Sequence, residues 1–265
     1  MPTLAASATV GHVMRERVTR GDLPHWYMPG AAHFVTYRLS DTIPIDVLGR
    51  LRAERELRVL LLGKRGADSW ENKSKAHKQF FADYDQYLDQ GLGKRWLESE
   101  EVAKIIIDNL YHHHEAKYQL LEYTVMPNHV HVLLVPFELD TDAGSVRHVT
   151  DASISIPKIP TDFVVEQDYL SDEVTDTQSP LTKIMHSLKS YTANEANRFL
   201  SREGRFWQRE SYDHWVRDHD ELGRVAEYIV QNPVQAKLVA NAWDWPYGSA
   251  YDRKHVREKR LPEWW

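Results

Sequence analysis

Two histidines separated by one residue stand in an otherwise apolar stretch of the sequence. The segment "YTVMPNHVHVLLVP", residues 123–136, carries His129 and His131 beside a run of valines and leucines. This β-branched and apolar run, bounded by prolines, predicts a buried β-strand. Alternate side chains of a strand point to the same face, so the two imidazoles lie side by side. Neutral imidazole is a common metal ligand, so the pair predicts a metal site; partly exposed or hydrogen-bonded histidines without a metal are the alternative.

A second group of reactive side chains falls on a predicted helix at about 180–200. Ser187, Tyr191, Glu195 and Arg198 recur at helical spacing, which places the phenol of Tyr191 beside the carboxylate of Glu195. Such pairs are common on exposed helix faces, and this one alone does not indicate catalysis.

Aromatic and basic residues alternate in "FWQRESYDHWVRD", residues 206–218. This mixture is typical of surfaces where unstacked bases lie on aromatic rings beside a phosphate track. Aromatic rings that close the protein core are an equally good interpretation. The segment itself is predicted to be extended or irregular.

The composition excludes several classes of protein. The chain has 265 residues, 42% of them hydrophobic, and no cysteine, so disulfides and thiolate metal sites are ruled out. No apolar stretch is long enough to span a membrane, and the N-terminus lacks the pattern of a signal peptide, which favours the cytoplasm. The net charge is −6, but residues 140–180 hold nine acidic residues against Arg147 and Lys158, and the rest of the chain is close to neutral.

The hydrophobic pattern predicts one domain with two insertions. We expect a loose N-terminal arm at 1–22, a domain at 23–250 and a basic aromatic tail at 251–265. The helical insertion covers about 44–115 and the acidic insertion about 139–180. The expected elements are strands at 33–39, 117–126 and through the histidine pair, and helices at 44–62, 72–89, 98–115, 180–200 and 219–231, the last ending at Asn232-Pro233.

Three motifs together resemble one family. "VMPNHVHVLLVP", "LTKIMHSLKSYTANEANRF" and "FWQRESYDHWVRD…YIVQNPVQAKLV" are similar to the REP-associated tyrosine transposases, within the HUH nuclease group. The resemblance implies an α+β fold, a ferredoxin-like antiparallel sheet with helices packed on it. It also implies that His129 and His131 bind the metal, that Tyr191 is the nucleophile, and that Glu195 is a third metal ligand. Tyr212 and Tyr228 are weaker candidates for the nucleophile.

The resemblance also implies a reaction. We expect a metal-dependent endonuclease and strand transferase that uses Mg²⁺ or Mn²⁺ and forms a 5′-phosphotyrosine intermediate on single-stranded or hairpin DNA. The expected DNA-binding residues are Lys189, Arg198, Arg205, Trp207, Arg209, Tyr212 and Trp215. A hairpin-binding protein without productive cleavage and a metal-dependent hydrolase that uses water are the alternatives. Association with the nucleoid would follow from DNA binding, and whether the protein acts as a homodimer stays open.

Overall fold

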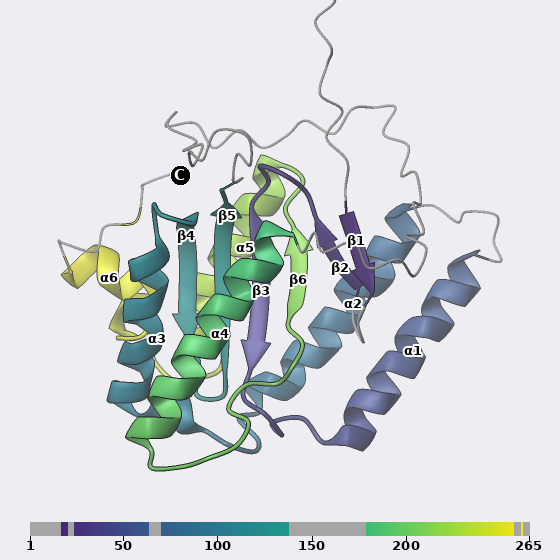
Figure 1. Ribbon diagram of the computed structural model, residues 1–265. Coiled ribbons are helices and arrows are strands. Elements are labelled where there is room, and N and C mark those ends of the chain that lie inside the picture. The colour runs from purple at the N-terminus through teal and green to yellow at the C-terminus, as the bar shows by residue number, and fades with distance from the viewer. Residues whose placement is uncertain (1–16, 21–23, 64–69, 138–178, 257–260, 262–265) are drawn as a thin grey trace, which may run out of the picture.

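The computed structural model describes residues 17–20, 24–63, 70–137, 179–256 and 261 (Figure 1). The predicted acidic insertion lies outside the described residues except for its last two positions, as does most of the predicted N-terminal arm. The end of that arm differs from the prediction, because β1 (Arg17–Arg20) pairs antiparallel with β2 (Pro24–Tyr27).

The central element is a four-stranded antiparallel sheet in the order β4-β5-β3-β6. Its strands are β3 (His33–Arg38), β4 (Tyr118–Val125), β5 (His129–Pro136) and β6 (Tyr212–Trp215). β5 lies between β3 and β4 and runs antiparallel to both. With helices after β3 and after β5, this is the ferredoxin-like β-α-β-β-α-β arrangement, and the predicted fold class is confirmed.

Two helices cover one face of the sheet, as Figure 1 shows. They are α3 (Glu100–His113) and α4 (Pro180–Phe199). α4 begins where its sequence predicts, because Ser179 Oγ accepts a hydrogen bond from the Thr182 N–H and Pro180 occupies the first turn. Apolar residues of both helices pack on Val130, Val132 and Leu134 of β5 to form the larger core.

The other face of the sheet carries the histidines. Strand alternation turns His129, His131 and Leu133 away from α3 and α4, toward α5 (His219–Gln235). The predicted end of α5 at Asn232-Pro233 is wrong, since the helix continues to Gln235. Pro233 lies in the last turn, where its missing N–H costs one backbone hydrogen bond, and its carbonyl still accepts from Leu238.

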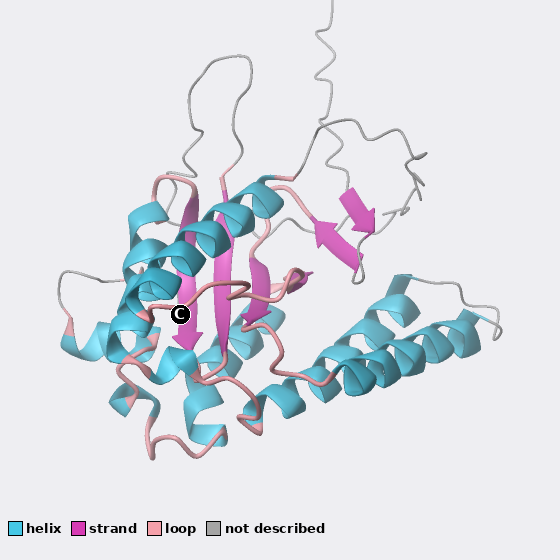
Figure 2. Cartoon of the chain, turned by 60° about the horizontal axis from the view of Figure 1, so that its bottom comes forward, coloured by secondary structure: helices cyan, strands magenta, loops and turns pink. Residues whose placement is uncertain are grey.

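A helical hairpin is inserted between β3 and α3. It consists of α1 (Ile45–Gly63) and α2 (Trp70–Asp89), which extend away from the sheet together (Figure 2). The C-terminal half of α2 packs against the sheet, where Phe81 stacks on Tyr212 with ring centroids 4.2 Å apart. This places the end of α2 over the histidine-bearing face of the sheet.

The remaining elements are short. They are η1 (Trp96–Glu98), η2 (Ala242–Asp244) and α6 (Ser249–His255). The predicted tail therefore starts inside a helix, and Arg253 forms an ion pair with the buried Glu122 of β4. None of the described helices is long and apolar enough to cross a membrane.

Candidate metal centre and nucleophile

The two histidines of β5 meet at their Nε2 atoms. His129 Nε2 and His131 Nε2 are 3.0 Å apart, and both residues are fully buried. Burial lowers the pKa of His129 to about 3 and the pKa of His131 well below its usual value, so both imidazoles are neutral. Neutral imidazoles are the form that binds a metal ion.

Neighbouring side chains orient both rings. His129 Nδ1 lies 2.6 Å from Asn128 Oδ1, while the amide nitrogen of Asn128 donates to the carbonyls of Leu88 and Leu92. The amide oxygen therefore faces the ring, Nδ1 must carry the proton, and Nε2 keeps its lone pair. His131 Nδ1 lies 2.7 Å from Thr36 Oγ1, which leaves a lone pair on its Nε2 when Nδ1 donates to this hydroxyl. Metal-binding histidines typically have such a hydrogen-bond partner on the ring nitrogen that does not bind the metal.

A carboxylate of the helical hairpin completes the group. Asp85 of α2 approaches His131 Nε2 to 3.5 Å with Oδ1, and one ligand atom from each of Asp85, His129 and His131 lies within 4.8 Å of the others. Oδ1 is buried and has no hydrogen-bond partner among the described residues. Burial, and after it the charge of Asp89, raise the pKa of Asp85 well above its usual range. A buried carboxylate that faces two neutral imidazoles has no positively charged partner in this group, and a bound cation would supply one.

This donor set fits a divalent cation. Two adjacent ligands of an octahedral ion bound at about 2.1 Å are about 3.0 Å apart, which matches the separation of the two Nε2 atoms. Two lone pairs at this distance also repel each other unless a cation or a proton lies between them. His129, His131 and Asp85 are thus a candidate metal centre with two nitrogen donors and one oxygen donor.

One tyrosine lies against this centre. The hydroxyl of Tyr228, on α5, donates a hydrogen bond to Asp85 Oδ2, and its ring centroid is 5.5 Å from that of His131. Tyr228 is half-buried and also lines an open depression of about 400 Å³ with Gly223, Arg224, Glu227 and Gln235. Its side chain therefore lies between the surface and the histidine pair.

The structure does not bring Tyr191 and Glu195 to the histidines. Both lie on α4, which packs on the opposite face of the sheet. Tyr191 is 52% exposed, and Glu195 forms an ion pair with Arg198 one turn further along the same helix. The residue next to His131 is instead Asp85. Among the three tyrosine candidates, Tyr228 contacts this donor group through Asp85, whereas Tyr212 is buried against Phe81.

The residues predicted to bind DNA divide into two groups. Trp207, Tyr212 and Trp215 are at most 4% exposed, so they close the core and cannot stack on bases, and that part of the prediction is corrected. Trp207 also donates its indole N–H to Thr192 Oγ1 at 2.9 Å. Arg198, Arg205 and Arg209 are exposed, and Lys189 is half-buried and donates its amine to the Arg209 carbonyl at 2.8 Å. The arginines remain available to phosphates.

Sequence patterns missed Asp85, Thr36 and Asn128. Asp85 is one of several acids in "FFADYDQYLD", and nothing in the helical pattern says which of them faces the sheet. Thr36 sits directly opposite His131 in the strand register, a pairing that only the fold reveals. Asn128 precedes His129 in the sequence, and a side-chain amide next to a predicted ligand was the one available signal.

A ferredoxin-like antiparallel sheet, a paired-histidine strand, a nearby carboxylate and a tyrosine agree with the HUH nuclease group that the motifs resemble. Comparison with known proteins gives the more particular likeness. The chain is 26% identical over 141 residues to a Haemophilus influenzae protein provisionally named REP-associated tyrosine transposase. The match spans 53% of this chain and 62% of the relative's length, and it confirms the resemblance to the REP-associated tyrosine transposases. No family model matches the chain.

A solved structure described as a REP-associated tyrosine transposase bound to a REP hairpin is also similar. It covers 92% of this chain, and the chain covers 90% of it, at 12% identity and a TM-score of 0.42.

Proposed function

We propose that this protein is a metal-dependent endonuclease and strand transferase for single-stranded DNA, with Tyr228 as its nucleophile. One observation carries the proposal: the hydroxyl of Tyr228 is hydrogen-bonded to a carboxylate that also faces a pair of metal-competent histidines. A tyrosine, a carboxylate and two neutral imidazoles supply a nucleophile, a proton acceptor and metal ligands at one point.

His129, His131 and Asp85 would hold the cation, and their nitrogen and oxygen donors suit Mg²⁺ or Mn²⁺. When bound, a divalent cation would supply positive charge to the non-bridging oxygens of a DNA phosphate. Asn128 and Thr36 keep both rings turned toward this position.

The carboxylate of Asp85 accepts the phenol proton of Tyr228 through Oδ2 as the phenol oxygen attacks phosphorus. A bond forms between the phenol oxygen and phosphorus, and the bond from phosphorus to the 3′ oxygen breaks. The 3′ oxygen leaves and takes up a proton, which gives a 5′-phosphotyrosine and a free 3′-OH. The new ester keeps the energy of the broken bond, so a second 3′-OH can reverse the step and join strands without another energy source.

Hairpin-forming repeat DNA is the substrate that the resemblance implies, and the exposed Arg205 and Arg209 offer phosphate contacts on the same chain. The substrate for a test would be an oligonucleotide from inverted repeats beside the gene, folded as a single-stranded hairpin and compared with the same sequence as a duplex.

The deciding experiment compares Tyr228→Phe with Tyr191→Phe in Mn²⁺ or Mg²⁺. We expect the wild type and Tyr191→Phe to become covalently attached to the 5′ end of the downstream fragment, in an adduct that survives denaturing electrophoresis. Tyr228→Phe should bind the hairpin and form no adduct. An adduct in Tyr228→Phe that is lost in Tyr191→Phe would return the nucleophile to α4. Cleavage without an adduct would indicate water as the nucleophile, and binding without cleavage by the wild type would indicate a DNA-binding protein.

A further inference from the structure

A buried arginine lies directly beside the histidine pair. Arg38 ends β3, and in the antiparallel register it stands opposite His129. It shares a sheet face with Thr36, whose hydroxyl contacts His131, so its side chain starts on the histidine-bearing face. Arg38 is only 2% exposed.

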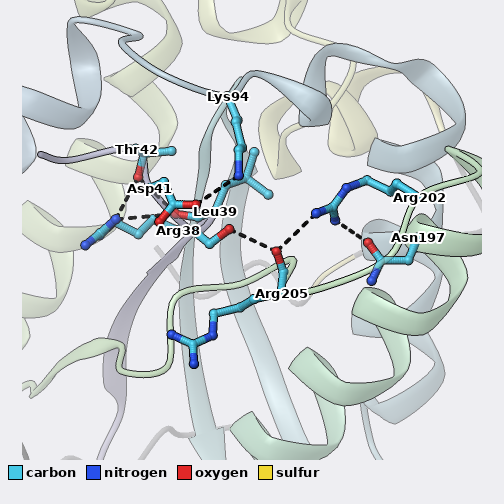
Figure 3. Close-up of polar contacts among 9 residues, drawn as sticks. Arg38, Leu39, Asp41, Thr42, Lys94, Asn197, Arg202 and Arg205 are labelled. Atoms are coloured by element: carbon cyan, nitrogen blue, oxygen red, sulfur yellow. Dashed lines mark hydrogen bonds and ion pairs between the residues drawn. The ribbon is translucent and has the colours of Figure 1, made fainter.

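Among the described residues, the groups that accept hydrogen bonds from the Arg38 side chain are all neutral. Its Nε donates to the hydroxyl of Tyr84 at 2.7 Å, and its Nη1 donates to Thr42 Oγ1 at 2.9 Å and more weakly to the Leu39 carbonyl. Figure 3 shows the guanidinium turned toward Thr42, away from Arg202. Within the part of the chain that the structure describes, Nη2 has no hydrogen-bond partner and no carboxylate pairs with Arg38.

Asp41 is a charged neighbour of this guanidinium, but the two form no ion pair. The Asp41 carboxylate is exposed and bonds Lys94 at 2.9 Å (Figure 3). The hydrogen bond from Lys94 is the main cause of the lowered pKa of Asp41, and the charge of Arg38 adds to it from a longer distance. Lys189 adds a second cation nearby: burial lowers its pKa to about 8, Glu210 opposes this shift, and the charge of Arg38 adds to it. A buried guanidinium that pairs with no carboxylate is unfavourable, which indicates a site that an anion fills.

We propose that Arg38 binds a phosphate of the DNA strand next to the metal centre. The inference rests on the proposed function and adds a residue to it. A guanidinium is planar and carries several donors in a fixed fork, so it suits two oxygens of one phosphate group. Tyr84 and Thr42 are positioning residues that hold the fork in place. Tyr84 and Asp85 are consecutive on α2, so one helix sets both the arginine and the carboxylate ligand.

A purely structural role makes the opposite prediction for stability. If Arg38 only tied the Leu39–Thr42 turn to α2, then Arg38→Met would lose three hydrogen bonds and unfold at a lower temperature. If Arg38 awaits an anion, then Arg38→Met removes an uncompensated buried charge and keeps most of the side-chain volume. Its unfolding temperature should then equal or exceed that of the wild type.

The test measures unfolding temperature and single-turnover cleavage for the wild type, Arg38→Met, Arg38→Lys and the control Lys104→Met, whose lysine is 67% exposed on α3, on the other side of the sheet. Millimolar sulfate, compared with chloride at equal ionic strength, should raise the unfolding temperature of the wild type and of Lys104→Met but not of Arg38→Met. Cleavage by Arg38→Met should fall about 100-fold, with partial recovery in Arg38→Lys.

Each outcome has a clear meaning. A large loss of stability in Arg38→Met, or an equal sulfate effect in it and the wild type, would overturn the assignment of Arg38. If the wild type does not cut DNA, the proposed function fails, but the sulfate effect and the stability of Arg38→Met still decide whether Arg38 is an anion site. Failure of Arg38→Met to fold counts as the same large loss of stability and overturns the assignment as well. An equal sulfate effect in Arg38→Lys and the wild type would reject it independently.

Discussion

The hydroxyl of Tyr228 is hydrogen-bonded to the carboxylate of Asp85, although the two residues are 143 positions apart in the sequence. One lies on α5 and the other on the inserted hairpin, and the histidine strand runs beneath both. The candidate nucleophile and the candidate metal ligand are therefore brought together only when the hairpin packs on the sheet.

Asp85→Asn should weaken metal binding. The substitution keeps the shape of the side chain and removes the negative charge that faces the two imidazoles. We expect the affinity for Mn²⁺ to fall by about 10- to 100-fold or more, measured by isothermal titration calorimetry. Asp83→Asn is the matched control, because Asp83 lies on the same helix and pairs with Arg58. Equal affinities in wild type and Asp85→Asn would remove Asp85 from the metal centre.

Thr36→Val tests the orientation of His131. Valine has nearly the same shape as threonine, but it cannot form a hydrogen bond with His131 Nδ1. The ring therefore loses the partner that keeps its Nε2 turned toward the metal position. We expect a loss of about 10-fold in Mn²⁺ affinity with a small change in fold stability. Thr192→Val is a suitable comparison, because that hydroxyl bonds Trp207 on the far side of the sheet and should leave metal binding unchanged.

His33 should make the protein sensitive to acid. Its Nε2 accepts the Met28 N–H and its Nδ1 lies 2.9 Å from the Ala31 carbonyl, an arrangement that requires the neutral ring. Burial lowers the pKa of His33 from 6.5 to about 3, while the Ala31 contact opposes the shift. The unfolded chain therefore binds the extra proton first, and the stabilising contribution is full above pH 6.5 and lost as the pH falls toward 3.

The expected size is about 1.4 kcal/mol of unfolding free energy per pH unit below 6.5 for this one histidine. Urea unfolding midpoints between pH 7 and pH 4 should fall less steeply in His33→Asn than in the wild type, whatever the stability at pH 7. His186→Asn, at an exposed position of α4, should keep the wild-type slope. Identical slopes in all three proteins would show that His33 is protonated in the folded state.

Arg205→Gln should weaken DNA binding without abolishing sequence preference. The side chain is exposed on the loop before β6, where its guanidinium can contact a phosphate. The slope of log affinity against log salt should become shallower by about 0.7 to 0.9, the value for one phosphate contact. An unchanged slope would place the DNA track elsewhere on the surface.

The sequence predicted three strands of the sheet and most helices because their signals are local, whereas β6 was expected only as an extended or irregular segment. The alternation in β3, the apolar run of β5 and the cap of α4 each depend on neighbours in the chain, and the structure has them within two residues of the predicted bounds. The exception was α5, where Pro233 is tolerated because it falls in the last helical turn.

The site was harder to predict because it depends on which face of the sheet each helix covers. Tyr191 and Glu195 lie one turn apart on α4, as their spacing predicted. That helix, however, packs on the face of the sheet opposite to the histidines. Asp85 and Tyr228 lie in separate helices whose contact with His131 follows from tertiary packing. Alternation within β5 showed that the two histidines share one face of the strand. Local patterns could not show which side chains of other elements contact them.

The complete burial of His129 and His131 has a kinetic consequence. An ion can reach them only after the side chains of Asp85 or Tyr228 swing away, so loading should not proceed at the diffusion limit. In stopped-flow mixing, the observed rate of Mn²⁺ uptake should level off as the concentration rises, because opening becomes the slow step. The plateau would then report how often α2, which carries Asp85, or α5, which carries Tyr228, moves aside. A disulfide between α2 and α5, introduced as a cysteine pair into a chain that has no cysteine of its own, should lower the uptake rate at this plateau.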